Sequence, residues 1–234
     1  MAPQLLGAGV VQSLSSSSLA GTLVTLAAVL MLLGAFACLG SKLFNRYVTY
    51  YALQSIALAF ACGVLAYHFH SADLWALTFI TLATKGTAVP LATRRLLVQR
   101  LGLRRDAAMA TGLSTSLIIG ALLTGFAFLV VQPQALPSGV VASSAVPLST
   151  ALVLLGGLIM VVRRHTVAQL IGWLITENGV FLGAVTLVST FPFIVEAGIF
   201  LDLVAAVLIM IAFVSGITRR LADATADQLR ELRG

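Results

Sequence analysis

The sequence predicts an all-α integral membrane protein with about seven transmembrane helices. Of its 234 residues, 59% are hydrophobic and 9% are charged, against about 25% charged in an average soluble domain. Apolar runs of about twenty residues recur along the chain, the length that a helix needs to cross about 30 Å of hydrocarbon. A β-barrel would show alternating segments of roughly ten residues instead. Within such apolar runs a helix satisfies its own backbone hydrogen bonds, so helices are the expected element.

The apolar runs follow one another in two parts. A serine-rich N-terminal segment, residues 1–18, precedes a four-helix membrane part, residues 19–131. An outer loop, residues 132–145, then leads to a three-helix part, residues 146–217, and a polar tail, residues 218–234. We expect the individual spans at residues 19–39, 47–67, 74–93, 107–131, 146–162, 167–189 and 193–217.

The basic residues of the connections predict the orientation of the chain. With seven spans, they all fall on one side of the membrane, whereas the opposite loops, residues 68–73, 132–144 and 190–192, contain no Lys or Arg. The positive-inside rule therefore places the N-terminus outside and the C-terminus in the cytoplasm. The same rule accounts for the net charge of +6 without a nucleic-acid ligand. The basic residues concerned are Lys42, Arg46, Arg94, Arg95, Arg100, Arg104, Arg105, Arg163, Arg164, Arg219 and Arg220.

Four ionisable residues lie inside the predicted spans: Lys85, Glu177, Glu196 and Asp202. A charge at bilayer depth costs at least about 2.5 kcal/mol, so such a residue is expected to pair, to contact water or to move ions. Counted from the nearest arginines, Lys85 lies roughly 13 Å, Glu177 roughly 20 Å and Asp202 roughly 25 Å above the cytoplasmic edge. Glu196 lies near the outer end of the seventh span. We interpret the four as proton-relay residues, and pairing that only joins helices is the alternative.

The sixth and seventh predicted spans are joined by a very short turn, residues 190–192, so they are expected to be antiparallel neighbours. Glu177 and Asp202 would then lie at nearby depths on adjacent helices. Asp202 and Glu196 are six residues apart and therefore point to different faces of one helix. We expect these two carboxylates to face different neighbours.

Several other residues carry weaker signals. Pro90 is expected to kink the third span and to free a backbone carbonyl near Lys85. Gln54 lies in the middle of the second span, where its amide can form a hydrogen bond across a helix interface. Gly156, Gly157 and Gly172 allow close approach of helices.

The sequence predicts no cofactor site, no metal site and no catalytic residue. It contains no Walker motif, no CxxC pair and no Gly-rich dinucleotide fingerprint. His68 and His70 have only Asp73 as an acidic companion, which does not make a metal site. Cys38 and Cys62 lie inside apolar runs and are expected to be free thiols.

The sixth span contains the pattern Q-x2-G-x4-E-N-G, which runs from Gln169 through Gly172 to Glu177, Asn178 and Gly179. This pattern resembles the signature of hydrogenase-4 component E, a family of membrane subunits of group 4 [NiFe] hydrogenases and their relatives. Other segments resemble the same family in the same order along the chain: residues 84–85 and 89–91 its third helix, residues 131–133 and 136–137 its outer loop, and residues 195–199 with Asp202 its last helix. The last three spans also resemble the K-type subunit of respiratory complex I, whose two buried glutamates belong to the proton path. Glu177 matches the first of these glutamates, and Asp202 lies near the second after a shorter loop.

The resemblance implies a multi-pass subunit of the inner (cytoplasmic) membrane, within a complex I-like assembly. Its implied partners are antiporter-like subunits, a membrane anchor subunit and a soluble hydrogenase-like module, together with the lipid bilayer. Its implied role is transfer of protons or sodium ions coupled to redox chemistry in other subunits, so the chain is not expected to be catalytic alone. Two alternatives remain open. One is a purely structural subunit that bridges antiporter-like neighbours, and the other is a stand-alone secondary transporter. Such transporters usually show repeats and broken helices, and the sequence shows neither clearly.

Overall fold

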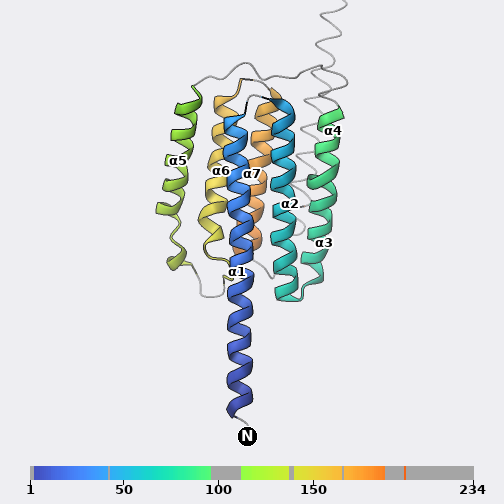
Figure 1. The fold of residues 1–234 in the computed structure, drawn as a ribbon, viewed down its shortest axis with the longest axis vertical. Helices are drawn as coiled ribbons and strands as arrows, with labels where there is room; N and C mark the ends of the chain where they lie inside the picture. Colours follow the sequence, from blue (N-terminus) through green and yellow to red (C-terminus); the bar gives the residue numbers. More distant parts are fainter. Residues whose placement is uncertain are drawn as a thin grey trace, which may run out of the picture.

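The structure, a computed structural model, describes residues 3–41, 43–95, 112–136, 140–164, 166–187 and 198. Helices make up this part of the chain (Figure 1). Their bounds are α1 Pro3–Gly40, α2 Phe44–Phe69, α3 Ala72–Thr81, the π-helical segment η1 Leu82–Ala88, α4 Val89–Arg95, α5 Leu113–Val130, the 3-10 turn η3 Pro133–Ala135, α6 Ala145–Val162 and α7 Thr166–Leu187.

Six helical spans in the described residues are long and apolar enough to cross a membrane: Leu19–Gly40, Arg46–Phe69, Ala72–Arg95, Leu113–Ala135, Ala145–Val162 and Ala168–Leu187. The expected class, an all-α multi-pass membrane protein, is confirmed for these spans. The predicted seventh span, residues 193–217, and the tail, residues 218–234, lie outside the described residues.

The helices form a bundle with a four-helix centre. Helix α6 packs against α7, α1 against α2 and α6, and α2 against α7. Helix α5 lies against α6 and α1, whereas α3 lies against α2, so these two helices occupy opposite edges of the bundle (Figure 1). In the apolar 18-residue window of each span, 61% of the residues are buried for α6 and for α7, but only 17% for α5. Most of α5 therefore faces lipid or another subunit.

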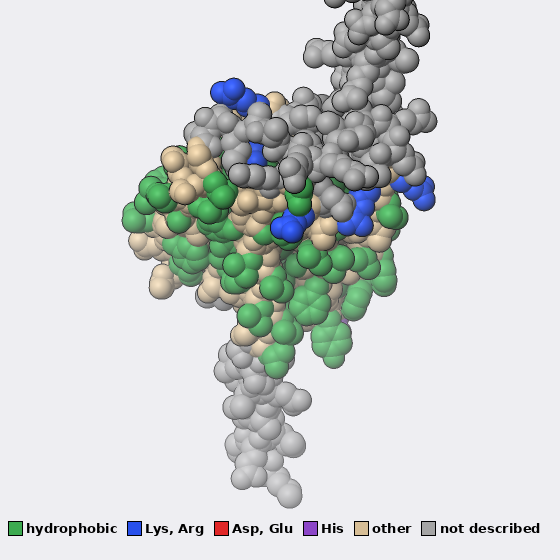
Figure 2. All heavy atoms as spheres, turned by 45° about the horizontal axis from the view of Figure 1, so that its top comes forward, with side chains coloured by type: hydrophobic (Ala, Val, Ile, Leu, Met, Phe, Trp, Pro, Cys, Tyr) green, Lys and Arg blue, Asp and Glu red, His purple; other side chains and the backbone are tan. Residues whose placement is uncertain are grey.

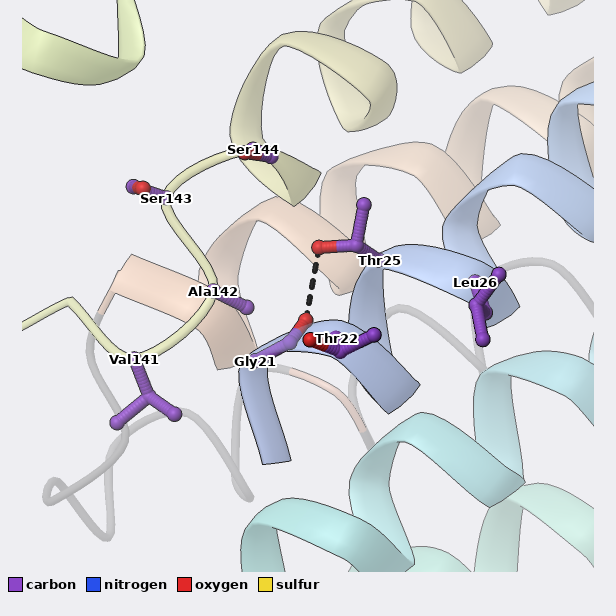
Figure 3. Close-up of a pocket in the computed structure, with 8 residues that line it drawn as sticks. All are labelled: Gly21, Thr22, Thr25, Leu26, Val141, Ala142, Ser143 and Ser144. Atoms are coloured by element: carbon purple, nitrogen blue, oxygen red, sulfur yellow. Dashed lines mark hydrogen bonds between the residues drawn. The ribbon is translucent and has the colours of Figure 1, made fainter. Parts of the chain in front are cut away.

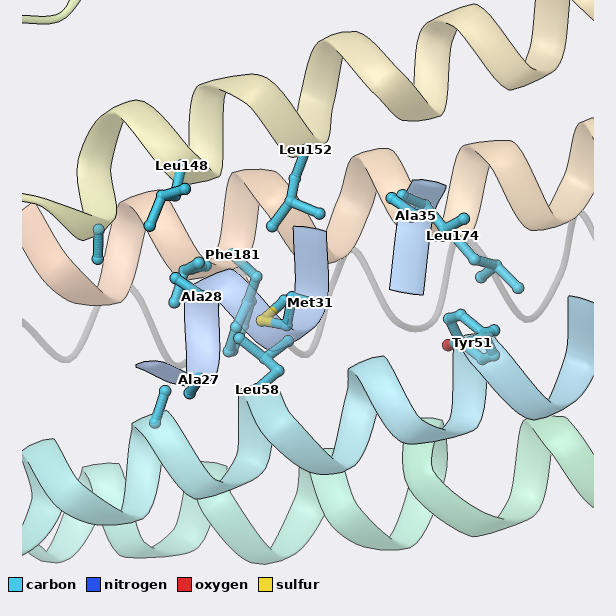
Figure 4. Packing of buried hydrophobic residues seen from close by; sticks show 14 of the residues in the cluster. Ala27, Ala28, Met31, Ala35, Tyr51, Leu58, Leu148, Leu152, Leu174 and Phe181 are labelled. Atoms are coloured by element: carbon cyan, nitrogen blue, oxygen red, sulfur yellow. The ribbon is translucent and has the colours of Figure 1, made fainter. Parts of the chain in front are cut away.

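The core lies where α1, α2, α6 and α7 meet. Met31, Leu58, Leu152 and Phe181 contribute one buried side chain from each of these helices (Figure 4). Lipid tails are as apolar as leucine, so close packing between helices, rather than escape from water, holds such a bundle together. The packing of these side chains consequently sets the relative rotation of the four helices.

The expected close approach of helices occurs between α6 and α7. A Cβ atom on Gly156 would collide with Thr176 Oγ1, and it would lie 2.6 Å from the carbonyl oxygen of Gly172. A Cβ atom on Gly172 would in turn lie 2.9 Å from the carbonyl oxygen of Gly156. Gly157, also predicted for this role, has no neighbouring atom within 4 Å of such a position. The contact therefore depends on Gly156 and Gly172, and it brings α7 close to α6.

The third span differs from a uniform α-helix. Between α3 and α4 the chain forms seven residues of π-helix, and the N–H of Val89 donates to the carbonyl oxygen of Thr84, five residues earlier. Pro90 follows directly, and it has no N–H to continue an α-helical pattern. The irregularity expected from Pro90 thus appears as a π-helical segment that precedes the proline and contains Lys85.

Helix α1 is longer than its predicted span, because it begins at Pro3, whereas its apolar window begins at Leu19. Near Leu19 the connection between η3 and α6 packs against it (Figure 3). A Cβ atom on Gly21 would collide with the carbonyl oxygen of Val141, so glycine is what permits this approach. The small cavity there, about 310 Å³, is lined by Gly21, Thr22, Thr25, Leu26 and residues 141–144.

Candidate functional site

Lys85 and Glu177 form an ion pair in the interior of the bundle. Lys85 comes from the π-helical segment η1 and Glu177 from α7, and the distance from Lys85 Nζ to Glu177 Oε1 is 3.0 Å. Only 4% of the lysine side chain and 3% of the glutamate side chain are exposed. A charge this far from water is tolerable only with a partner. The structure therefore brings two of the four predicted ionisable residues together as one site.

The two side chains meet, although the depths expected from the sequence differ by roughly 7 Å. The count for Glu177 started from Arg164, which is exposed. The count for Lys85 started from Arg94, which is exposed. The long aliphatic stem of lysine also lets its ammonium group lie well away from its own backbone.

An aromatic ring and an irregular backbone surround the lysine. Its Nζ lies 5.2 Å from the centre of the Phe181 ring, one turn after Glu177 on α7. A ring face at this distance attracts a cation that has lost its water shell. The lysine itself is part of η1, and π-helical turns occur frequently at functional sites. The ammonium group is thus held between a carboxylate and an aromatic ring of the same helix.

A second buried polar group, the amide cluster, lies on the neighbouring residue of α7. It consists of Asn178, Gln54 and Ser55. Asn178 Nδ2 donates to Gln54 Oε1 at 3.4 Å and to Ser55 Oγ at 3.2 Å, and Gln54 Nε2 donates to the carbonyl oxygen of Met31 at 2.8 Å. The expected hydrogen bond of Gln54 across a helix interface is confirmed. The cluster ties α7 to α2 and α1 beside the ion pair and limits rotation of the helix that carries Glu177.

Arg163 forms a third polar group, which sequence reasoning missed. It was expected at the membrane edge, but its residue is 0% exposed, and its Nη2 donates to the carbonyl oxygens of Leu39 at 2.7 Å and Ser41 at 2.8 Å. The ring of Tyr47 lies 5.3 Å from its guanidinium carbon. The end of a helix leaves carbonyl oxygens without intrahelical partners and carries partial negative charge, so it favours a cation. The last turn of α1 itself contains no basic residue, and this was the available signal.

Two of the predicted relay residues, Glu196 and Asp202, lie outside the described residues. The expected proximity of Asp202 to Glu177 stays a prediction. At the other end of the span that contains Gln54, the His70 ring stacks on Tyr67 and the His68 ring meets Phe69 edge-on. Within the described residues, no group of three or more His, Cys, Asp or Glu side chains could hold a metal ion.

The ion pair can exist in two protonation states with different charge distributions. In one state an ammonium faces a carboxylate, and in the other a proton has moved so that a neutral amine faces a carboxylic acid. The proton can move between the two groups while the net charge of the pair stays zero.

Comparison with known proteins identifies several relatives, of which two are representative. The chain is 34% identical over 160 residues to the uncharacterized protein Rv0085 of Mycobacterium tuberculosis, covering 68% of this chain and 73% of that protein. It is 28% identical over 211 residues to hydrogenase-4 component E of Escherichia coli, covering 88% of this chain and 94% of that protein. No family model and no solved structure matches the chain.

Proposed function

The chain belongs to one family with Rv0085 and is homologous to hydrogenase-4 component E over 88% of its length, and on this premise we propose that it is a membrane-arm subunit of a complex I-like, hydrogenase-type complex. In that complex Lys85 and Glu177 form part of a proton path that is coupled to redox chemistry in other subunits. In this proposal the redox chemistry takes place in other subunits, and this chain contributes by moving protons.

The observation that carries this proposal is the burial of the ion pair. Replacement of a buried ion pair by well-packed apolar side chains is often neutral or stabilising, so stability alone does not account for the pair. Ionisable residues inside membrane spans typically mark ion pathways and proton relays. The near-complete burial of both side chains, 4% and 3% exposed, makes Lys85 and Glu177 residues of this kind.

The geometry favours a proton over a sodium ion at this site. Sodium would need several oxygen ligands around the carboxylate of Glu177. Lys85 Nζ already lies 3.0 Å from Glu177 Oε1, where its positive charge would repel a metal cation. A proton can be exchanged between the same two groups without displacing either of them.

We extend the proposal to orientation, to the remaining relay residues and to partners. The described basic connections share one end of the bundle, where α2 begins and α4 ends, and arginines gather there beside a broad apolar surface (Figure 2). The positive-inside rule then supports an outside N-terminus and a cytoplasmic C-terminus in the inner membrane. Asp202 and Glu196 would continue the path, and antiporter-like subunits, an anchor subunit and a soluble hydrogenase-like module would be the partners.

The amide cluster favours a second candidate function. Gln54, Ser55 and Asn178 join three helices through hydrogen bonds alone, so buried polar groups in this bundle also have a purely structural use. In this alternative the chain bridges antiporter-like subunits, and Lys85 and Glu177 pair without conducting.

The change Glu177→Gln in the assembled complex tests the proposal. It keeps the shape of the side chain but removes the exchangeable proton and the charge. We expect electron transfer to continue while proton translocation falls about 100-fold, the scale of a lost proton-transfer group. Translocation is measured as redox-driven acidification in proteoliposomes.

The matched control is Asp73→Asn, the same acid-to-amide change in the first turn of α3, which should leave translocation unchanged. A Glu177→Gln complex that assembles and translocates protons normally would contradict the relay role. If the variant complex does not assemble, the combined change of both members of the pair, described in the Discussion, replaces it.

A further inference from the structure

A large groove opens on the surface of the bundle, away from the ion pair, between α1 and α3. Helix α2 forms its floor, with Phe60 and Gly63, whereas Leu23 of α1 and Thr78 of α3 line its sides. Its volume is about 1140 Å³, slightly above the roughly 300–1,000 Å³ of ordinary small-molecule pockets. We call this cavity the α1–α3 groove.

The length of the groove matches one leaflet of a bilayer. Along α2 its lining runs from Ile56 to His68, which is about 18 Å at 1.5 Å per residue. Half of the hydrocarbon thickness of a bilayer is about 15 Å. A partner transmembrane helix would require a groove along the full thickness, whereas an acyl chain of one leaflet requires only half. The dimension therefore favours a lipid over a protein helix as the occupant.

The two ends of the groove differ in chemistry. At the end farther from the arginines, the rim consists of Tyr67, His68, His70 and Trp75, all of which have N–H or O–H groups that can donate hydrogen bonds. The phosphate and ester oxygens of a phospholipid are acceptors. Such amphipathic aromatic side chains are typical of the headgroup level of a membrane. A polar, donor-rich rim above an apolar groove is complementary to a headgroup above its acyl chain.

We propose that the α1–α3 groove binds one acyl chain of a phospholipid from the leaflet opposite the arginine-bearing end. The headgroup of this lipid lies against the tyrosine, histidine and tryptophan side chains of the rim. This inference is independent of the proton path, because it depends only on the groove and on the membrane around it.

The inner end of the groove reaches the π-helical segment that carries the lysine of the ion pair. Ile56 and Leu82 line this end, and both pack at Gly86, where a Cβ atom would lie 3.6 Å from Ile56 Cγ1 and 3.3 Å from Leu82 Cδ1. Gly86 directly follows Lys85. An acyl chain in the groove therefore ends beside Leu82 of the π-helical segment, which also contains Lys85.

The first test measures lipid retained by the full chain. We would purify the chain in detergent after reconstitution in phosphatidylcholine vesicles and count bound phospholipid by native mass spectrometry. We expect one phospholipid per chain. The change Gly63→Leu fills the floor of the groove and should reduce retention about tenfold, a modest change in binding free energy.

The control for this test is Gly125→Leu on α5. Gly125 has no neighbouring atom within 4 Å of a Cβ position, so the same substitution there adds the same apolar volume and helix propensity outside the groove. Retention equal in the Gly63→Leu and Gly125→Leu chains would overturn the proposal, as would a wild-type chain without bound lipid.

The second test identifies the occupant in native membranes. A photoreactive phenylalanine analogue in place of Phe60, which lines the groove, should form lipid adducts on illumination of membranes that contain the assembled complex. The same analogue in place of Phe126 on α5 serves as the comparison outside the groove. Crosslinks from position 60 to another protein chain would overturn the proposal, because they would show a partner subunit in the groove.

Discussion

At the scale of single residues, three of the buried polar groups in the described part of the chain have different tasks. The ion pair of Lys85 and Glu177 contains two charges that balance each other, the amide cluster contains none, and Arg163 is a cation whose described hydrogen-bond partners are neutral carbonyl oxygens. Only the first group combines a titratable acid with a titratable base. Proton transfer is therefore expected at the pair, whereas the other two groups position helices.

Arg163 gives a prediction about stability. The change Arg163→Met removes the donors to the carbonyl oxygens of Leu39 and Ser41 and leaves them buried, which should lower the free energy of unfolding by about 3 kcal/mol. Thermal unfolding of the full chain in detergent would show this as a lower midpoint. The adjacent and exposed Arg164 offers the control Arg164→Met, and equal midpoints for the two variants would mean that Arg163 does not hold the end of α1.

At the scale of elements, the sequence predicted the described helices well and their irregularities poorly. Apolar runs locate α1, α2, α6 and α7 because a membrane span requires about twenty apolar residues whatever its neighbours. The fourth span was expected to begin at Ala107, which lies outside the described residues. In the structure α5 begins at Leu113. The π-helical form of the segment around Lys85 could not be predicted, since its hydrogen-bond pattern depends on contacts between helices as well as on Pro90.

The candidate site, like the helices, could be predicted from the sequence only in part. The cost of burying charge made Lys85 and Glu177 recognisable in the sequence, but their pairing depends on how η1 and α7 both pack against α2. The participation of Ser55 in the amide cluster also depended on packing, because a single serine in an apolar span has many alternative partners, including the carbonyl oxygens of its own helix.

The contact between α6 and α7 gives a prediction at this scale. The change Gly156→Leu places a side chain where Thr176 and Gly172 already lie, and it should destabilise the chain by about 3 kcal/mol through overpacking. The neighbouring Gly157 has open space around it, so Gly157→Leu is a control with the same change one residue away. Thermal unfolding midpoints that fall equally in both variants would show that the effect comes from glycine loss alone and not from the helix contact.

At the scale of the whole molecule, charge and apolar surface are separated as a membrane subunit requires. The arginines gather at one end of the bundle, and apolar side chains cover the surface beside them (Figure 2). Helix α5 exposes Ile118, Leu122, Phe126 and Leu129, a face suited to lipid or to another transmembrane subunit. The polar interior, by contrast, links η1, α7, α2 and α1 across the bundle in the plane of the membrane. This arrangement is compatible with lateral proton transfer to neighbouring subunits.

The most direct test of the central claim removes both charges of the pair at once. The changes Lys85→Met and Glu177→Gln together leave no unpaired charge at the site of the ion pair, so the complex should assemble, and its redox-driven proton translocation can be measured in proteoliposomes. The relay account predicts that the complex assembles and transfers electrons but no longer translocates protons. Normal translocation by this doubly changed complex would contradict the account and would leave the pair as a structural contact between η1 and α7.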